Sequence, residues 1–470
     1  MIFAHGGLLS DGELPHVLAH LEEEINGTRQ TRTLPAERVI DALDGLGKRL
    51  SAGEFDALLA RYLPAGTGPE ALLPLLDRKS LEEKLRVELG PEPFAPRPME
   101  GTVTRTEPLG TLFHVTAGNV PGLPVYSAVE GLLTGNVNLV KLPHGDKGLT
   151  LAALSLLTDA EPALADFLYA FDLPSSDRES LVALAALADG VVTWGGDGAV
   201  AAVRALAPAG CRLIEWGHRL SFAYIAGYED RERELAGLAR NIIGTGQRLC
   251  SSCQVIFLDT EDQETAERFC RAFLPVLEAE SLRRSGPGAL AQSTLCGYTA
   301  FLERAAGGLS AGERHYPGRG CSVTLRPDRE LELSPMEGNV LVKALPRREL
   351  LGTLRRQKGR LQTAGLLCAR GEREELTQLL CRAGVTRITR AGRMSETFPG
   401  EGHDGEYHLR RYVRMVDVER SLRERNNGTR PAMQPSPAVF EFSPAGNRSP
   451  STCRCPERPA WAGPVSADRI

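Results

Sequence analysis

The stretch "GTLFHVTAGNVPGLPVYSAVEGLLTGNVNLVKLP", residues 110–143, decides the fold. It begins with a short β-rich run at 110–118, passes through a turn into a helical segment, and closes with an apolar strand at 136–143. A helix between two apolar strands is typical of a parallel sheet, whose strands are joined by crossover helices. We therefore expect an α/β domain here.

The alternation of strands and helices continues beyond this stretch. Helices are predicted at 146–160 and 265–280, and further strands within "DGVVTW", "GCRLIEWG", "RLSFAYIAG", "CQVIFLD", "CSVTLRPD", "NVLVKAL" and "TRITRAG". Such alternation indicates mainly parallel sheets with helices on both faces. Right-handed crossovers then make these domains doubly wound.

The two ends of the chain differ from this pattern in composition and in the spacing of apolar residues. Residues 1–95 show apolar spacing near 3.6, which predicts a helical N-terminal region. Residues 426–470 are rich in Pro, Ser, Gly and Asn without periodicity, which predicts a disordered tail.

Composition excludes several classes of protein. The chain has 470 residues, a net charge of −5 and 6% aromatic residues, which argues against a nucleic-acid partner. Ten cysteines in a chain this long do not form a secreted disulfide scaffold. No stretch approaches 18 uncharged apolar residues, and the start lacks the pattern of a signal peptide. We expect a cytoplasmic protein with reduced thiols and no membrane span.

Two cysteines, Cys250 and Cys253, stand three positions apart in "TGQRLCSSCQ". A zinc site would need a second ligand pair at compatible spacing, so no metal is expected. A redox pair stays possible, although Cys253 runs into a predicted strand where a thioredoxin-like motif would enter a helix. A glycine-containing turn before Cys250 also fits a nucleophile, which needs exposure and a lowered pKa.

Other segments could bind phosphate or act as a base. "WGGDGAV" at 194–200 joins a strand to a helix, where free N–H groups favour a diphosphate, but a plain tight turn would read the same way. Lys141, His144 and Lys147 could form a cationic pocket at a strand end, or be solvated loop residues. Glu215 ends a strand and is either a general base or a surface residue.

In this order, the segments resemble the aldehyde dehydrogenase superfamily, and more closely its acyl-CoA reductase branch, the LuxC-type fatty acid reductases of bacterial luminescence. The resemblance rests on residues 110–143, "VTWGGDGAV", "EWGHRLSFAYI", "GQRLCSSCQVIF" and "GVTRITRAGRMSETFPGEGHDGEYHLRRYVRMVD". Each motif is weak alone, but five in the correct order are specific. Cys253 departs from the branch, which usually has proline there; it is either a harmless replacement or able to form a disulfide with Cys250.

The resemblance implies an aldehyde-dehydrogenase-like fold of two doubly wound, Rossmann-like α/β domains with a small oligomerisation element. The nucleotide-binding domain would span 96–217, the catalytic domain 218–395, and a C-terminal return and oligomerisation segment 396–425. Cys250 would be the nucleophile, Asn119 an oxyanion donor together with the Cys250 backbone N–H, and Glu215 would stand at the general-base position of hydrolytic relatives. The residues implied in cofactor binding are Lys141, His144, Lys147, Trp194, Gly195, Gly196 and Gly217.

The implied activity is NADPH-dependent reduction of a long-chain acyl-CoA or acyl thioester to the aldehyde through an acyl-cysteine. NADPH is expected because His144 stands where NAD-using relatives carry a glutamate that would repel a 2′-phosphate. The alternatives are an aldehyde dehydrogenase that forms the acid with Glu215 as base, and a thiol acyltransferase or scaffold of the same fold. Implied partners are an acyl-protein synthetase, an acyltransferase, and further copies in a homodimer or homotetramer.

Overall fold

The computed structural model describes residues 1–62, 75–118, 120–308, 310–398 and 400–420. Of the described residues, Met1–Val418 form one compact unit. The predicted disordered tail at 426–470 lies outside the described residues.

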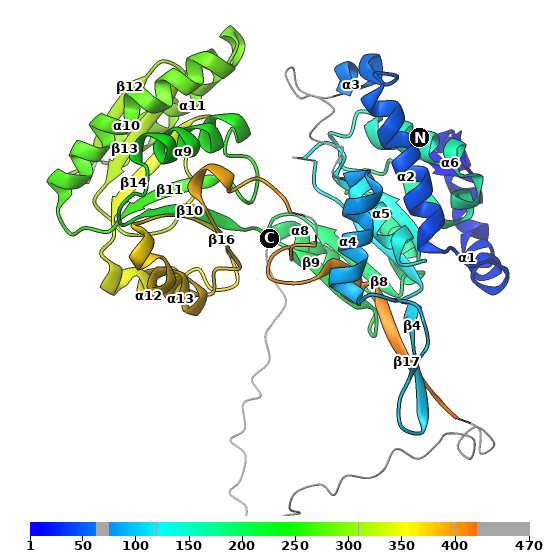
Figure 1. Ribbon diagram of the computed structural model, residues 1–470. Helices are drawn as coiled ribbons and strands as arrows, with labels where there is room; N and C mark the ends of the chain where they lie inside the picture. The colour runs from blue at the N-terminus through cyan, green and yellow to red at the C-terminus, as the bar shows by residue number, and fades with distance from the viewer. Residues whose placement is uncertain (63–74, 119, 309, 399, 421–470) are drawn as a thin grey trace, which may run out of the picture. The chain divides into compact units, whose positions relative to one another are not determined.

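The first sheet has the strand order β2-β1-β7-β6-β5-β8-β9. Its strands β8 and β9 are labelled in Figure 1. Its strands from β7 to β9 run parallel, whereas β1 and β2 form an antiparallel hairpin on the edge beside β7. The chain builds from β5 outward to β7 and then crosses to β8, so a topological switch point lies at the carboxyl ends of β5 and β8. The bounds are β1 Ile2–Ala4, β2 Gly7–Leu9, β5 Thr111–Val115, β6 Val137–Lys141, β7 Leu168–Phe171, β8 Gly190–Trp194 and β9 Arg212–Trp216.

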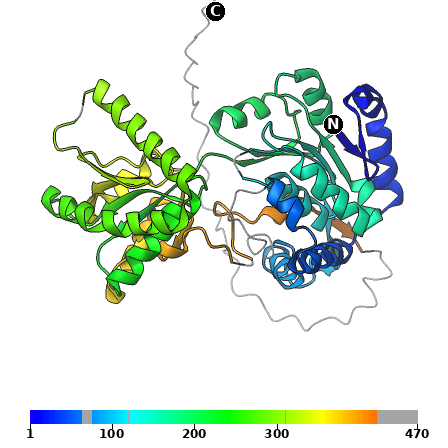
Figure 2. The same cartoon turned by 90° about the horizontal axis from the view of Figure 1, so that it is seen from above.

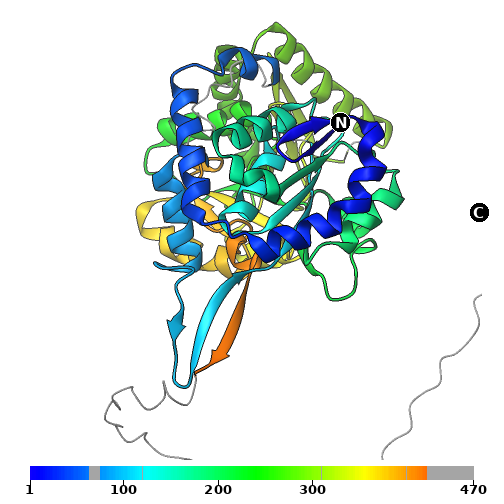
Figure 3. The ribbon, with the colours of Figure 1, turned by 90° about the vertical axis from the view of Figure 1, so that its right-hand side faces the viewer.

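Residues 1–95 differ from the prediction of an all-helical region. β1 and β2 precede the helices, and β1 extends the sheet by pairing Ile2 with Phe171. Three-residue strands are too short to show alternation, and β1 is buried because tertiary pairing holds it. The N-terminal helices, drawn in blue, lie against the first sheet and its helices in all views (Figures 1, 2 and 3). The helix bounds are α1 Leu14–Thr31, α2 Ala36–Ser51, α3 Asp56–Tyr62, α4 Arg78–Leu89, α5 Leu123–Leu133, α6 Leu149–Ala160, α7 Arg178–Ala186 and α8 Asp197–Arg204.

Polar side chains fix how α5 packs on this sheet. Asn138 on β6 is fully buried, and its Oδ1 lies 3.0 Å from Nε2 of His114 on β5. Gly131 on α5 passes directly over it, because a Cβ there would lie 1.8 Å from the Asn138 oxygen. The close approach of helix and strand at this point requires glycine.

The second sheet has the order β12-β13-β14-β11-β10-β15-β16, parallel except for β12. Alternate residues of β10 face opposite cores: Ala223 packs with α9 and α10, and Phe222 with α12 and α13. Helices therefore cover both faces, as Figure 1 shows. The bounds are β10 Leu220–Ile225, β11 Cys253–Leu258, β12 Arg314–Gly318, β13 Cys321–Arg326, β14 Asn339–Ala344, β15 Leu361–Leu367, β16 Arg387–Thr389, α9 Arg231–Thr245, α10 Gln263–Arg284, α11 Pro287–Ala306, α12 Arg347–Arg355 and α13 Arg373–Ala383.

A third, small sheet joins residues far apart in the sequence. Its order is β17-β4-β3, with β3 at Arg97–Pro98, β4 at Thr102–Pro108 and β17 at Val413–Glu419. Figure 3 shows β17 in orange beside β4. β17 follows the short helix α14 (His408–Arg411) and exposes Met415, Val416 and Val418. The two predicted doubly wound sheets and a small third element are thus all present.

Candidate active site

The turn that carries Cys250 is shaped by the end of α9. Helix α9 stops at Thr245 because Gly246 (φ 55°) adopts the left-handed conformation that commonly ends helices. Gln247 follows with φ 60°, which is uncommon for a residue with a side chain. The chain then crosses to β11, which begins at Cys253. Cys250 therefore lies on a turn between a helix and a central strand.

Buried hydrogen bonds of Gln247 hold this turn in place. The side chain donates from Nε2 to the Cys253 carbonyl (2.9 Å) and to Ser334 Oγ (2.8 Å). Its Oε1 accepts from the Gly338 N–H at 3.1 Å, and its carbonyl accepts from Gln254 Nε2 at 2.8 Å. Removing such a buried partner leaves unsatisfied groups, so Gln247 is the structural centre of the turn.

The two cysteines of the turn have different surroundings. Cys250 is exposed, whereas Cys253 is fully buried in the core beneath α9 and α10. Burial raises the pKa of the Cys253 thiol to about 12, so Cys253 is a packing residue with no reactive thiolate. The sequence left a symmetric redox pair open; these environments favour an asymmetric site with Cys250 as its reactive member.

The pKa of the Cys250 thiol is raised, whereas a nucleophilic cysteine was expected to have a lowered one. Protein atoms crowd the sulfur although the residue is exposed, and this desolvation is the largest effect on the thiol. The Gln362 side chain and the backbone N–H groups of Ser251 and Cys250 act in the opposite direction, and the Asp404 carboxylate adds to the rise. Without substrate, Cys250 is therefore mainly a thiol at neutral pH, surrounded by donors that favour its thiolate.

The other two predicted catalytic residues have different outcomes. Asn119, between Gly118 and Val120 in the sequence, lies outside the described residues. Glu215 is described on β9, where its carboxylate accepts from both Nε and Nη2 of Arg204 on α8, the latter at 2.6 Å. This bidentate pair engages both carboxylate oxygens of Glu215.

The predicted cofactor residues lie at the carboxyl ends of β6, β8 and β9. Lys141 ends β6; burial lowers its pKa, and its Nζ donates to Ser175 Oγ at 3.3 Å. Trp194 ends β8 as a mostly buried residue whose indole N–H donates to Ser127 Oγ at 3.0 Å. After it, Gly196 precedes α8, and an added Cβ there would meet nothing within 4 Å. Gly217 follows β9 in a similarly open position.

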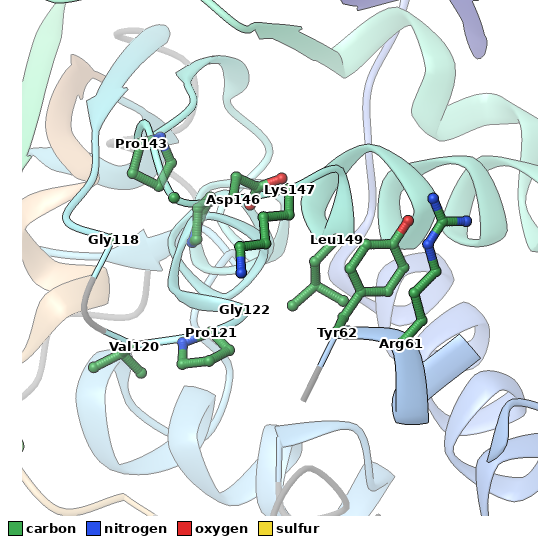
Figure 4. A pocket seen from close by; sticks show the side chains of 12 residues that line it. Arg61, Tyr62, Gly118, Val120, Pro121, Gly122, Pro143, Asp146, Lys147 and Leu149 are labelled. Atoms are coloured by element: carbon green, nitrogen blue, oxygen red, sulfur yellow. The ribbon is translucent and has the colours of Figure 1, made fainter. Parts of the chain in front are cut away.

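A cavity of about 350 Å³ opens beside the loops after β5 and β6. Lys147 and Asp146 line it from the loop after β6, Pro121 from the loop after β5, and Arg61 and Tyr62 from α3, as Figure 4 shows. The Asp146 carboxylate is occupied by the Thr150 backbone N–H (3.0 Å) and hydroxyl, which leaves Lys147 and Arg61 as the cations of the cavity. His144, on the same loop, is exposed but does not line it.

A buried charged cluster, which the sequence reading did not identify, fixes the C-terminal return. Glu130 on α5 accepts from His408 Nδ1 (2.7 Å) on α14 and pairs with Lys84 Nζ (3.0 Å) on α4. Burial alone would raise the pKa of Glu130, but His408 and Lys84 hold it far below its usual range. The cluster ties the segment that carries His403 and Asp404 to the first sheet, and the His403 ring packs on Trp194 at 5.5 Å between centroids.

Two polar residues near Cys250 were also missed. Gln362 lies on β15, and its Nε2 donates to Asp404 Oδ1 at 2.6 Å. The available signals were a glutamine in the otherwise apolar run "LQTAGLL" and a glycine-rich segment, "GEGHDGEYH", that was quoted only as a family signature. Their proximity could not be read from the sequence because they come together through the tertiary fold.

Neither a membrane span nor a metal cluster is found in the described part of the chain. No described helix combines the length and apolar character needed to cross a bilayer. Among the same residues, no group of three or more His, Cys, Asp or Glu side chains is arranged to hold a metal ion.

Solved structures identify the class of fold. Methylmalonate-semialdehyde dehydrogenase from Oceanimonas doudoroffii matches with a TM-score of 0.68 and 13% identity, over 89% of this chain and 97% of that one. An aldehyde dehydrogenase C mutant from Pseudomonas syringae, determined with NAD+ and octanal, matches with a TM-score of 0.65 and 12% identity, over 89% and 96% of the two chains. The fold is that of the aldehyde dehydrogenases, which confirms the predicted fold class.

Sequence comparison then gives the family. The model of the acyl-CoA reductase (LuxC) family matches residues 32–415, so the chain belongs to that family, as the ordered motifs predicted. It is 25% identical over 328 residues to the long-chain acyl-protein thioester reductase of Aliivibrio fischeri, covering 67% of this chain and 65% of that protein. The Vibrio harveyi protein of the same name is 27% identical over 195 residues, covering 40% and 41%. The matches thus span less than two thirds of these relatives' lengths.

Proposed function

We propose that the protein reduces a long-chain acyl thioester, as acyl-CoA or acyl-protein, to the aldehyde, with Cys250 as covalent nucleophile. The observation that carries this proposal is the exposed Cys250 on a braced helix-to-strand turn in a chain of the acyl-CoA reductase (LuxC) family. The names of its relatives, long-chain acyl-protein thioester reductases, support the substrate class.

The first chemical step is a thioester exchange at Cys250. Its thiolate forms a bond to the acyl carbon, the bond from that carbon to the carrier sulfur breaks, and the carrier leaves as a thiol with the proton that Cys250 gives up. The Cys250 backbone N–H and Asn119 are proposed as donors to the oxyanion; one such donor is worth about 10²–10³ in rate. The exchange stores the acyl group as a new thioester on the protein.

The residues at the first sheet fit a nicotinamide nucleotide, which would supply the hydride that converts the acyl level to the aldehyde. Gly196, with open space where a Cβ would be, precedes α8 and would let a diphosphate approach. Lys141 would contact a ribose. Lys147 and Arg61 line the cavity as cations, which favours a 2′-phosphate, and therefore NADPH.

The geometry argues against one of the two alternative functions. An acid-forming dehydrogenase would need Glu215 as a free base, and both of its oxygens are engaged by Arg204. A thiol acyltransferase or scaffold would need no nucleotide, so a protein that leaves NADPH fluorescence unchanged on mixing would support that alternative and contradict ours.

The proposal extends to assembly. β17 forms the edge of the third sheet and exposes Met415, Val416 and Val418, which supports pairing with a second copy as a homodimer or homotetramer. An acyl-protein synthetase and an acyltransferase are proposed as further partners on the basis of the family. Mass measurement in solution tests the first point.

The decisive experiment is Cys250→Ala, assayed with acyl-CoAs of different chain length and either NADPH or NADH. Loss of aldehyde formation by about 10³-fold or more is expected, because the covalent route is closed. The matched control is Cys381→Ala, which removes another exposed cysteine, on α13, and should retain full activity. A Cys250→Ala protein that reduces acyl-CoA at the wild-type rate contradicts the mechanism.

A further inference from the structure

We call residues 246–252, the turn that carries Cys250, the nucleophile turn. The neighbouring strand β10 has a shift in its pairing register on both sides. On β10, Leu220 pairs with Leu361 and Phe222 with Ala364, so Ser221 alone faces two residues of β15, Gln362 and Thr363.

The same shift occurs toward β11. Ser221 pairs with Cys253 and Phe222 with Val255, which leaves Gln254 as the extra residue. Bulges of this kind occur beside active sites, where they re-aim side chains. Ser221 therefore stands at a double bulge at the base of the nucleophile turn.

Ser221 uses this position to connect Cys250 to β15. Its hydroxyl donates to the Cys250 carbonyl at 2.6 Å and accepts from the Thr363 N–H at 2.9 Å. The residue before Thr363 is Gln362, which is 5% exposed and whose side chain reaches the Cys250 thiol. The bulge thus fixes the backbone of the nucleophile and directs a buried amide toward its sulfur.

Asp404 fixes the orientation of that amide. Gln362 Nε2 lies 2.6 Å from Asp404 Oδ1. Because a carboxylate can only accept a hydrogen bond, the NH₂ group of the Gln362 amide must face Asp404. Asp404 is itself held by Arg219, whose Nε lies 2.8 Å from Oδ2, and its side chain is 2% exposed. Its φ of 53° is rare for a residue with a side chain, and such strain concentrates at functional sites.

The charges around the thiol act in opposite senses. Beyond desolvation, the Gln362 amide lowers the pKa of Cys250 and the Asp404 carboxylate raises it. Burial lowers the pKa of His403 to about 4, so this neighbour is neutral above pH 7. The charged or titratable side chains on the elements around the thiol include His218, Arg219, Arg248, Arg360, His403 and Asp404, and Arg248 and Arg360 are paired with Glu337 and Asp197.

We propose that Gln362 and Asp404 are positioning residues for the nucleophile: Asp404 holds the Gln362 amide so that it donates to the Cys250 sulfur and aims it at the acyl carbon. Gln362 transfers no proton; it donates a hydrogen bond to sulfur while the carbon–sulfur bond forms. This inference rests on the proposed function and adds to it the residues that prepare Cys250.

The test measures the ionisation of the Cys250 thiol directly and needs no reductase assay. The full chain is alkylated with iodoacetamide between pH 7 and 10.5, and the masses of the Cys250 and Cys381 peptides are followed, with Cys381 as internal reference. Gln362→Met keeps the length of the side chain and removes its donors. The inflection in the plot of Cys250 alkylation rate against pH should therefore move up by about one pH unit, which slows alkylation at pH 8 about tenfold. Asp404→Asn removes the charge and should move the inflection down.

Opposite shifts are the signature of the proposal, because damage to the turn would move both variants in the same direction. Unchanged inflections in both variants, or shifts of one sign, overturn it. Gln378→Met, on the exposed face of α13, is the matched control and should give the wild-type profile. If Gln362→Met does not fold, Gln362→Glu takes its place, because it keeps the shape of the side chain and replaces the donor by an acceptor; its inflection should also move up. Reductase activity in Cys250→Ala would refute the proposed function but leave these shifts as they are.

Discussion

The nucleophile turn and the loop after β6 are built in contrasting ways. The turn is held by a fully buried glutamine, Gln247, whose hydrogen bonds reach β11, Ser334 and Gly338. The loop after β6 carries the exposed side chains of His144 and Lys147, with its main anchor at Asp146. Groups that react at one atom need fixed positions, whereas a loop that receives a dissociable nucleotide must leave its charges accessible.

The largest effect is expected where the turn is braced. Gln247→Ala removes the side-chain partners of Cys253, Ser334 and Gly338 and leaves buried groups unsatisfied. We expect a loss of about 3 kcal/mol in the free energy of unfolding by urea. Activity should fall about 100-fold, because the sulfur is no longer held in place. Gln378→Ala, an exposed glutamine, should change stability by less than about 0.5 kcal/mol; equal losses in both variants would contradict the contrast.

The next largest effect is a loss of stability at acidic pH, which is expected from His114 on β5 of the first sheet. Burial lowers its pKa to about 4 from 6.5, so the unfolded chain takes up this proton more readily than the folded protein. The contribution of neutral His114 to the free energy of unfolding is complete above pH 6.5 and is lost as the pH falls toward 4. Between pH 7.5 and 4.5 this loss is on the order of 3 kcal/mol.

His114→Gln should flatten the dependence of the free energy of unfolding on pH over this interval, as urea titrations at several pH values would show. His20→Gln, on the exposed face of α1, should keep the wild-type slope. An identical slope in His114→Gln and the wild type would exclude His114 as the source.

A smaller and more selective effect is expected in the open loop. Lys147→Gln removes one cation of the cavity beside α3 and should raise the KM for NADPH about tenfold, since one phosphate contact is lost. The KM for NADH and the free energy of unfolding should stay unchanged. Lys358→Gln, exposed outside the cavity, is the control. A parallel rise for both nucleotides would show that Lys147 does not read the 2′-phosphate.

The smallest effect is expected at Cys253. Cys253→Ala removes a buried sulfur and should cost about 1 kcal/mol of stability while activity stays within a few-fold. Mild oxidation with diamide should inactivate the wild type and this variant at the same rate, because the buried thiol is not available to Cys250. Slower inactivation of the variant, or a Cys250–Cys253 disulfide in the peptide masses of the wild type, would contradict this result.

Much of the fold could be predicted from the sequence because its signals are local. Apolar runs such as "NVNLVKLP" and "CQVIFLD" stand between helical segments, and the structure has β6 and β11 there. The hairpin of β1 and β2 could not be predicted, because its strands are three residues long and are stabilised by pairing with β7. Strand β15 was not identified either, although all its residues are buried.

The candidate site divides in the same way. Cys250 and Lys141 stand in motifs whose order along the chain is informative, so the sequence alone could propose them as site residues. Gln362 and Asp404 act only through their position beside a residue more than a hundred places earlier, and a lone glutamine or aspartate carries no such information. The raised pKa of Cys250 likewise depends on atoms packed around the sulfur, which no spacing encodes.

The position of Asp404 also sets an order of events during synthesis. Asp404 follows Cys250 by 154 positions, and the segment around it is anchored by His408 on Glu130, a residue made much earlier. A chain growing on the ribosome therefore presents its cysteine long before the amide and carboxylate around it are assembled. The thiol acquires its final surroundings only after residues 403–408 have been made and have packed against the first sheet and its helices.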